Sequence, residues 1–83
     1  MKGKIMNLKD KYLAIEAAER NGLDVDDMTD ALAIEVEEIF LRKGYDVRPE
    51  YMTDEGVMVR FYNKDDTHYD EFMTWEEIQH SLN

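Results

Sequence analysis

The run from Asp24 to Gly44, DVDDMTDALAIEVEEIFLRKG, is the longest stretch with helical periodicity, and it constrains the fold more than any other feature. At about 100° per residue, one broad apolar stripe forms, which predicts a helix facing a core. The stripe consists of Met28, Leu32, Val36, Ile39 and Phe40. Ile34 and Leu41 lie on the opposite side, so the helix is either sandwiched inside the fold or carries a second seam for a partner. The sequence does not choose between these two arrangements.

The ends of this helix carry start and stop signals. Asp24, Asp26 and Asp27 precede or open it, where carboxylates complement the positive end of the helix dipole and accept hydrogen bonds from free N–H groups. Gly44 suits the left-handed residue that follows a helix, and Tyr45 can pack back on the last turn. Both ends therefore agree with the periodicity.

A shorter amphipathic helix precedes it. Asn7 is a plausible N-cap, and the helix extends to about Arg20, after a lead-in over residues 1–6 that we expect to be frayed. Gly22 suits the left-handed position after this helix, and Leu23 can contact Ala18 as in a Schellman ending.

Beyond Tyr45 the apolar period changes from 3.6 to 2, which predicts strands separated by turns. We expect three strands, over residues 45–51, 57–62 and 67–73, with turns at 53–56 and 63–66. Pro49 cannot donate a hydrogen bond to a neighbouring strand and therefore marks the first strand as an edge. Val57, Val59 and Phe61 share one face of the second strand and Met58, Arg60 and Tyr62 share the other, so this strand should be central.

The sequence Thr74-Trp75-Glu76-Glu77 reads as a capping box that opens a short last helix. Trp75, Ile78 and Leu82 would form its apolar stripe. We therefore predict an α+β fold of order ααβββα, with two N-terminal helices, a three-stranded antiparallel meander and a short C-terminal helix. The whole chain, residues 1–83, is expected to form one small acidic domain.

Charge is the strongest compositional feature. The chain carries 20 acidic and 10 basic residues, a net charge of −10, which repels nucleic acid and anionic membranes and favours basic partners. The excess lies in two blocks, residues 21–41 and 65–83, neither of which contains a lysine or arginine. A solubility role explains such charge as well as a binding role does, and the binding interpretation needs both blocks on one face.

Residues suited to catalysis or ligand binding are sparse. Ser81 is the lone serine, and His68 and His80 are isolated, although His68 and Asp70 would share one strand face. An EF-hand register beginning at Asp24 fails because its sixth position is Thr29, where that loop needs glycine. With no cysteine and no glycine-rich phosphate loop, we expect no enzyme, no catalytic residue, no metal and no cofactor.

The leading hypothesis is therefore an acidic inhibitor that binds another protein. Carboxylates on the long helix could imitate phosphates and occupy the basic channel of a larger, nucleic-acid-processing protein, as do inhibitors that phages and mobile elements encode, for example anti-CRISPR proteins. This is an analogy of size and charge. The expected acidic binding face consists of Asp26, Asp30, Glu37, Glu38, Asp65, Asp66, Asp70, Glu71 and Glu76. No direct nucleic-acid binding is expected.

The alternative is a small adaptor or oligomerising module that uses Ile34 and Leu41 as an apolar seam, with a homodimer as one form. Salt separates the two, because an electrostatic mimic loses its partner as ionic strength rises and an apolar seam does not. The start of the chain has no apolar run of signal-peptide length, and no segment reaches the roughly 18 apolar residues of a membrane span, so a cytoplasmic location is expected.

Overall fold

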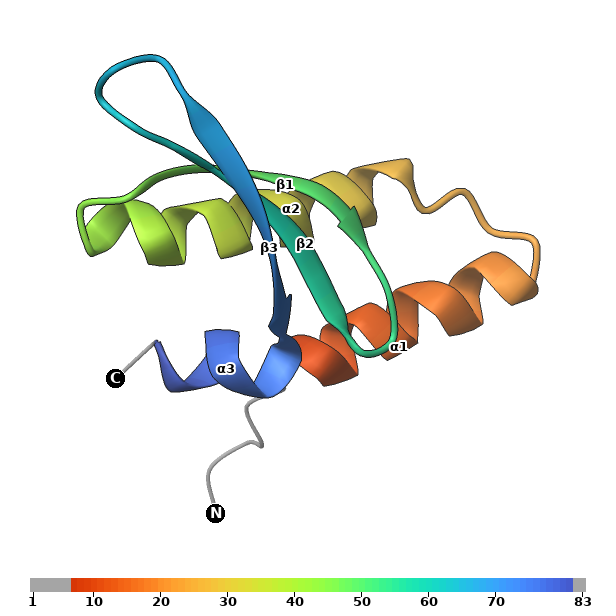
Figure 1. Ribbon diagram of the computed structural model, residues 1–83. Helices are drawn as coiled ribbons and strands as arrows, with labels where there is room; N and C mark the ends of the chain where they lie inside the picture. Colours follow the sequence, from red (N-terminus) through yellow and green to blue (C-terminus); the bar gives the residue numbers. More distant parts are fainter. Residues whose placement is uncertain (1–6, 82–83) are drawn as a thin grey trace.

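The computed structural model describes residues 7–81, which form three helices and three strands (Figure 1). The elements are α1 (Leu8–Arg20), α2 (Asp26–Arg42), β1 (Asp46–Met52), β2 (Gly56–Tyr62), β3 (His68–Thr74) and α3 (Trp75–His80). The predicted ααβββα order is confirmed, with each boundary within two residues of its expected place. The expectation of a frayed start at residues 1–6, and the place of Leu82 in the last apolar stripe, lie outside the described residues.

The strands form one antiparallel sheet in the order β1-β2-β3. β2 is central, as predicted, and its Val57, Val59 and Phe61 are buried on one face. β1 is an edge strand, as Pro49 indicated, and its pairing with β2 is irregular between Pro49 and Tyr51. The β2–β3 pairing is regular over seven residue pairs.

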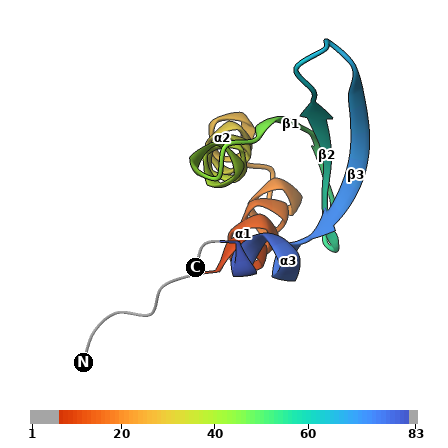
Figure 2. The same cartoon turned by 60° about the vertical axis from the view of Figure 1, so that its left-hand side comes forward.

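All three helices lie on the same side of the sheet (Figure 2). α2 packs against β1, and α1 packs against both α2 and α3. The far end of the β2–β3 hairpin extends beyond the helices (Figure 1). No element within residues 7–81 covers the other face of the sheet, which is therefore open to solvent.

The core lies between the helices and the inner face of β1 and β2. The α2 residues Leu32, Val36, Ile39 and Phe40 are buried there, as their spacing predicted. Met28 is an exception: it was expected in the same stripe but is 43% exposed. The reason is that α1 presents Lys11 and the small Ala14 near Met28, and these side chains are too short or too polar to cover its thioether.

The predicted helix endings are also present. Gly22 has φ +81°, and the N–H of Leu23 donates to the carbonyl of Ala18 at 3.1 Å, which is the Schellman pattern. Gly44 has φ +90°, and the Tyr45 N–H donates to the Phe40 carbonyl at 3.0 Å. Both glycines thus end their helices in a conformation that side chains with a Cβ rarely adopt.

The junction between β3 and α3 fixes the sheet to the helices. Thr74 and Glu77 form the predicted capping box. The buried Trp75 donates from Nε1 to the Thr53 carbonyl at 2.8 Å, and its ring lies 5.6 Å from that of Tyr12. None of the described helices combines the length and apolar character that crossing a membrane requires.

Candidate functional site

Carboxylates on α2 line a groove between this helix and β1. Asp26 and Asp30 line a hollow of about 690 Å³, together with residues of α1 and β1. Asp30 and Glu37 line a second hollow of about 660 Å³ further along α2. The two hollows share Asp30, Ala33 and Pro49, so they form one continuous surface feature, which we call the acidic groove.

The floor and walls of the acidic groove are partly apolar. Ile15, Val25 and Ala33 contribute aliphatic surface, and Pro49 and Met52 contribute the β1 side. A groove with low-dielectric walls concentrates the field of the charges that line it, so cations are attracted more strongly than on a flat surface.

The first hollow carries acidic side chains without basic ones. Glu16 and Glu19 of α1 face it alongside Asp26 and Asp30, and no lysine or arginine lines it. Within residues 7–81 none of these four carboxylates forms an ion pair; the pairs there join Lys11 to Glu35 and Arg60 to Glu50 and Asp70. The second hollow is mixed, because Arg48 lines it with Asp30, Glu37 and Asp46. Negative charge is thus densest where α1 and α2 approach β1.

Tyr12 links this region to the core. Its hydroxyl lies 3.3 Å from a carboxylate oxygen of Glu16 and 3.4 Å from the carbonyl of Met52. Burial of the phenol, followed by the neighbouring Glu16 charge, raises the pKa of Tyr12. Tyr12 therefore stays neutral near physiological pH and donates to the groove's carboxylate.

The acidic residues of the second block do not join this groove. Asp70 is paired in register with Arg60 on the open face of the sheet, where the Arg60 Nε–Asp70 Oδ1 distance is 2.9 Å. Glu71, the next residue of β3, pairs with Val59 on the helix-bearing face. Because neighbouring strand residues point to opposite faces, Asp70 and Glu71 cannot belong to one binding surface. The hydrogen bond from Arg60 lowers the pKa of Asp70.

Asp65 and Asp66 lie at the β2–β3 turn, at the end of the hairpin that extends past the helices. The hydroxyl of Thr67 lies 2.6 Å from Asp65 Oδ1, and this hydrogen bond lowers the pKa of Asp65. Asp66 adopts φ +70°, which completes the turn. These carboxylates serve the turn, and the predicted nine-residue acidic face is divided among separate surfaces.

The second apolar side of α2, formed by Ile34 and Leu41, is exposed. Ile34 is 53% exposed and lines the second hollow of the groove, while Leu41 is 62% exposed and lies outside both hollows. The sandwiched arrangement of α2 is therefore wrong, because its second apolar side faces solvent. Glu38 is likewise exposed on α2 but does not line the groove.

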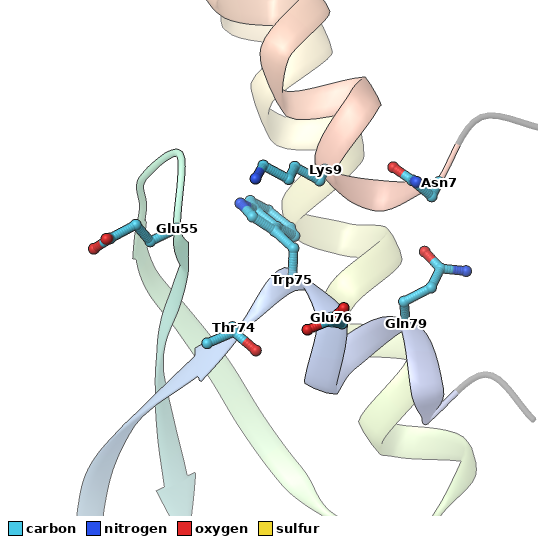
Figure 3. Close-up of a pocket in the computed structure, with 7 residues that line it drawn as sticks. All are labelled: Asn7, Lys9, Glu55, Thr74, Trp75, Glu76 and Gln79. Atoms are coloured by element: carbon cyan, nitrogen blue, oxygen red, sulfur yellow. The ribbon is translucent and has the colours of Figure 1, made fainter.

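A smaller pocket of about 290 Å³ lies where α1, the β1–β2 turn and α3 meet (Figure 3). Trp75 lies at its centre, beside Lys9 of α1 and Thr74 (Figure 3). Glu76, the last of the predicted acidic residues, also lines it. Trp75 already donates its N–H to Thr53, so the pocket presents no unpaired buried polar group as a ligand anchor.

The histidines are placed apart from each other. His68 lies on the open face of the sheet, with its ring 6.0 Å from that of Tyr62, and His80 is exposed in the last turn of α3. His68 and Asp70 do share a face, but Asp70 is already held by Arg60. Across residues 7–81 no three histidine or acidic side chains converge on a point that could hold a metal ion.

No protein-family model matches the chain, and the searches of curated proteins and of solved structures likewise give no significant match.

The structure adds Glu16 and Glu19 to the candidate site. A local signal existed, since Glu19 lies in the last turn of α1, where the negative end of the helix dipole disfavours a carboxylate. The proximity of Glu19 to Asp26 and Asp30, however, depends on how α1 and α2 pack.

Proposed function

We propose that this chain is a protein-binding module and not an enzyme, and that its acidic groove holds a lysine- or arginine-rich segment of a partner. The observation that carries the proposal is the row of carboxylates without ion-pair partners, Glu16, Glu19, Asp26 and Asp30, around a partly apolar hollow. Basic side chains suit such a site because their aliphatic stems contact the apolar floor while their charges meet the rim.

The partner class follows from charge. A surface that attracts this groove is basic, and basic surfaces on proteins frequently serve to bind nucleic acid. We therefore propose that the chain inhibits a nucleic-acid-processing protein by occupying its nucleic-acid site, as phage-type inhibitors such as anti-CRISPR proteins do. Such an inhibitor would act in the cytoplasm.

Ile34 supports an apolar contribution to the same contact. It lies on the groove's α2 wall with more than half of its side chain exposed. An adaptor that binds through Ile34 and Leu41 alone remains the second candidate, and it differs in being insensitive to salt.

The test compares two triple variants that remove the same charge. The groove variant is Asp26→Asn, Asp30→Asn, Glu37→Gln, and the control is Asp65→Asn, Asp66→Asn, Glu76→Gln, whose residues lie outside the groove. Exposed ion pairs contribute about 0.2–1 kcal/mol each, so losing three weakens binding roughly 3- to 150-fold. The readout is capture of proteins from a lysate of the native host at about 0.15 M salt, with and without competing DNA.

The proposal predicts a captured nucleic-acid-processing protein that DNA displaces, that the groove variant loses and that the control retains. A partner that is indifferent to DNA and to the groove variant, but is lost on Ile34→Asp or Leu41→Asp, would establish the apolar seam instead. Equal loss with both triple variants would show that net charge alone drives the capture.

A further inference from the structure

The uncovered side of the sheet is organised in three rows, which we call the open face. By strand register the rows are Tyr51–Met58–Phe72, Arg48–Arg60–Asp70 and Asp46–Tyr62–His68. Each row crosses all three strands, so the rows are stacked along the strand direction. The first is apolar or aromatic, the second is charged, and the third is mixed.

The apolar row is a contiguous exposed surface. Tyr51 is 54% exposed, Phe72 is 37% exposed, and Met58 lies between them on the central strand. No element within residues 7–81 lies over this row. Contiguous exposed apolar side chains framed by polar ones are typical of protein interfaces.

The charges on the open face nearly cancel, unlike those of the rest of the molecule. Arg60 Nε lies 2.9 Å from Asp70 Oδ1, and Arg60 Nη2 lies 3.7 Å from Glu50 Oε1. Arg48 lies in the same row as Arg60 and Asp70. The three rows carry two arginines and two carboxylates, Asp46 and Asp70, with Glu50 of the irregular part of β1 beside Arg60, against a net charge of −10 for the chain. Two copies of so acidic a protein repel each other least when they meet through a face of mixed sign.

We infer that the open face is an interface with a second copy of this chain. A twofold axis parallel to the strands and above β2 places β1 of one copy over β3 of the other, as an isologous contact requires. In this arrangement Arg48 lies opposite the partner's Asp70, and Tyr51 lies opposite the partner's Phe72. At the axis Arg60 lies opposite the partner's Arg60, and the Asp70 and Glu50 carboxylates beside each guanidinium offset this like-charge contact. Each contact occurs twice, and the strand directions of the two sheets stay aligned as in packed sheets.

The size of the open face sets the strength of this contact. Three strands about 4.8 Å apart and seven residues of about 3.3 Å give a patch of roughly 14 by 23 Å. That is about 320 Å² per copy, below the roughly 800 Å² per partner of a standard interface, so the contact is of the weak, transient kind and the dimer should form reversibly, toward the upper end of the concentrations tested. Salt strengthens it, because screening reduces the repulsion between the two acidic copies.

The experiment is analytical ultracentrifugation of the full chain from about 10 to 500 μM, at low and at high salt. Wild type should shift from monomer to dimer with concentration, and more readily at high salt. Phe72→Glu should weaken association at least tenfold, while the matched control Leu41→Glu, another exposed apolar residue that lies on α2, should leave it unchanged. Circular dichroism verifies that both variants fold.

A charge exchange then tests the orientation. Arg48→Glu and Asp70→Arg each place like charges opposite one another in a homodimer, so each variant alone should stay monomeric. An equimolar mixture should associate, because both cross-pairs in the mixed dimer are again of opposite sign. A monomer under every condition, or a dimer that Leu41→Glu abolishes and Phe72→Glu does not, would overturn the inference; a mixture that stays monomeric would overturn the twofold arrangement.

Discussion

Gly56→Ala should destabilise the protein severely, although Gly56 adopts an ordinary backbone conformation. Gly56 opens β2, directly beside the end of β3. A Cβ built on it would lie 2.1 Å from the Met73 carbonyl oxygen and 2.7 Å from the Thr74 Cα, whereas ordinary contacts are 3.4–4 Å. To remove these clashes, the backbones of β2 and β3 must separate by more than 1 Å, because the clashing atoms are backbone and no flexible side chain can move away instead.

The magnitude follows from the cost of overpacking. Forcing backbone apart in a packed region costs about 1–3 kcal/mol and sometimes more, and two backbone clashes place this substitution at the upper end. A domain of this length has a free energy of unfolding of about 4–12 kcal/mol, so about 3 kcal/mol removes a large fraction of it. The melting temperature should fall by roughly 12–24 °C.

Urea and thermal unfolding, followed by circular dichroism and by Trp75 fluorescence, measure this loss. The matched controls are Gly22→Ala and Gly44→Ala, where a Cβ meets nothing within 4 Å but φ is positive. Each should cost about 1–2 kcal/mol through conformational strain alone. A Gly56→Ala variant as stable as these two would refute the argument that the close approach of β2 and β3 requires glycine here.

Three further substitutions test local features. Asp70→Asn should make the free energy of unfolding less dependent on pH in acid. Arg60 lowers the folded pKa of Asp70, so the stability that Asp70 contributes is present above its unfolded pKa and is lost as pH falls through its folded pKa; urea unfolding between about pH 2 and 6 measures this dependence. Asp66→Gly should raise the unfolding free energy by a few tenths to about 1 kcal/mol, since φ is +70° there, and a decrease in denaturation midpoint would contradict this. Thr74→Ala should cost about 1 kcal/mol by removing the cap bonded to the Glu77 N–H, measurable as a shift in the same midpoint.

The order of elements could be predicted because its signals are local. A 3.6-residue period, a capping box such as that of Thr74 and Glu77, and glycines after two helices each depend on neighbours in sequence. The edge position of β1 was also predictable, because Pro49 lacks the N–H that a central strand needs. These features hold whatever the tertiary packing.

The candidate site could not be predicted in the same way. Glu16 and Glu19 reach Asp26 and Asp30 only through the packing of α1 on α2, which no local pattern encodes. The inner face of β3 was equally hard to predict, because most of its residues are exposed on both faces and the alternation of residue types does not mark a buried side. The pairing of Asp70 with Arg60, and hence the division of the second acidic block, depends on strand register.

The two proposed surfaces differ in their response to salt, and this difference makes them separable in one protein. Binding of a basic segment in the acidic groove weakens as salt screens the carboxylates, whereas association of the open faces strengthens as salt screens the repulsion between copies. The two surfaces share the β1 edge, because Tyr51 lines the first hollow and Asp46, Arg48 and Tyr62 line the second. Glu16, Glu19 and Asp26 belong to the helix side of the sheet, so dimerisation through the open face leaves these three carboxylates accessible. A dimer would then present two grooves, and a target with two basic segments would be held by both, so the overall affinity would exceed that of either single contact.

Phe72→Glu should abolish that gain while preserving the affinity for a single basic segment, which a comparison of monovalent and divalent basic peptides by fluorescence anisotropy would measure. An equal loss of affinity for both peptides would show instead that the open face contributes directly to peptide binding.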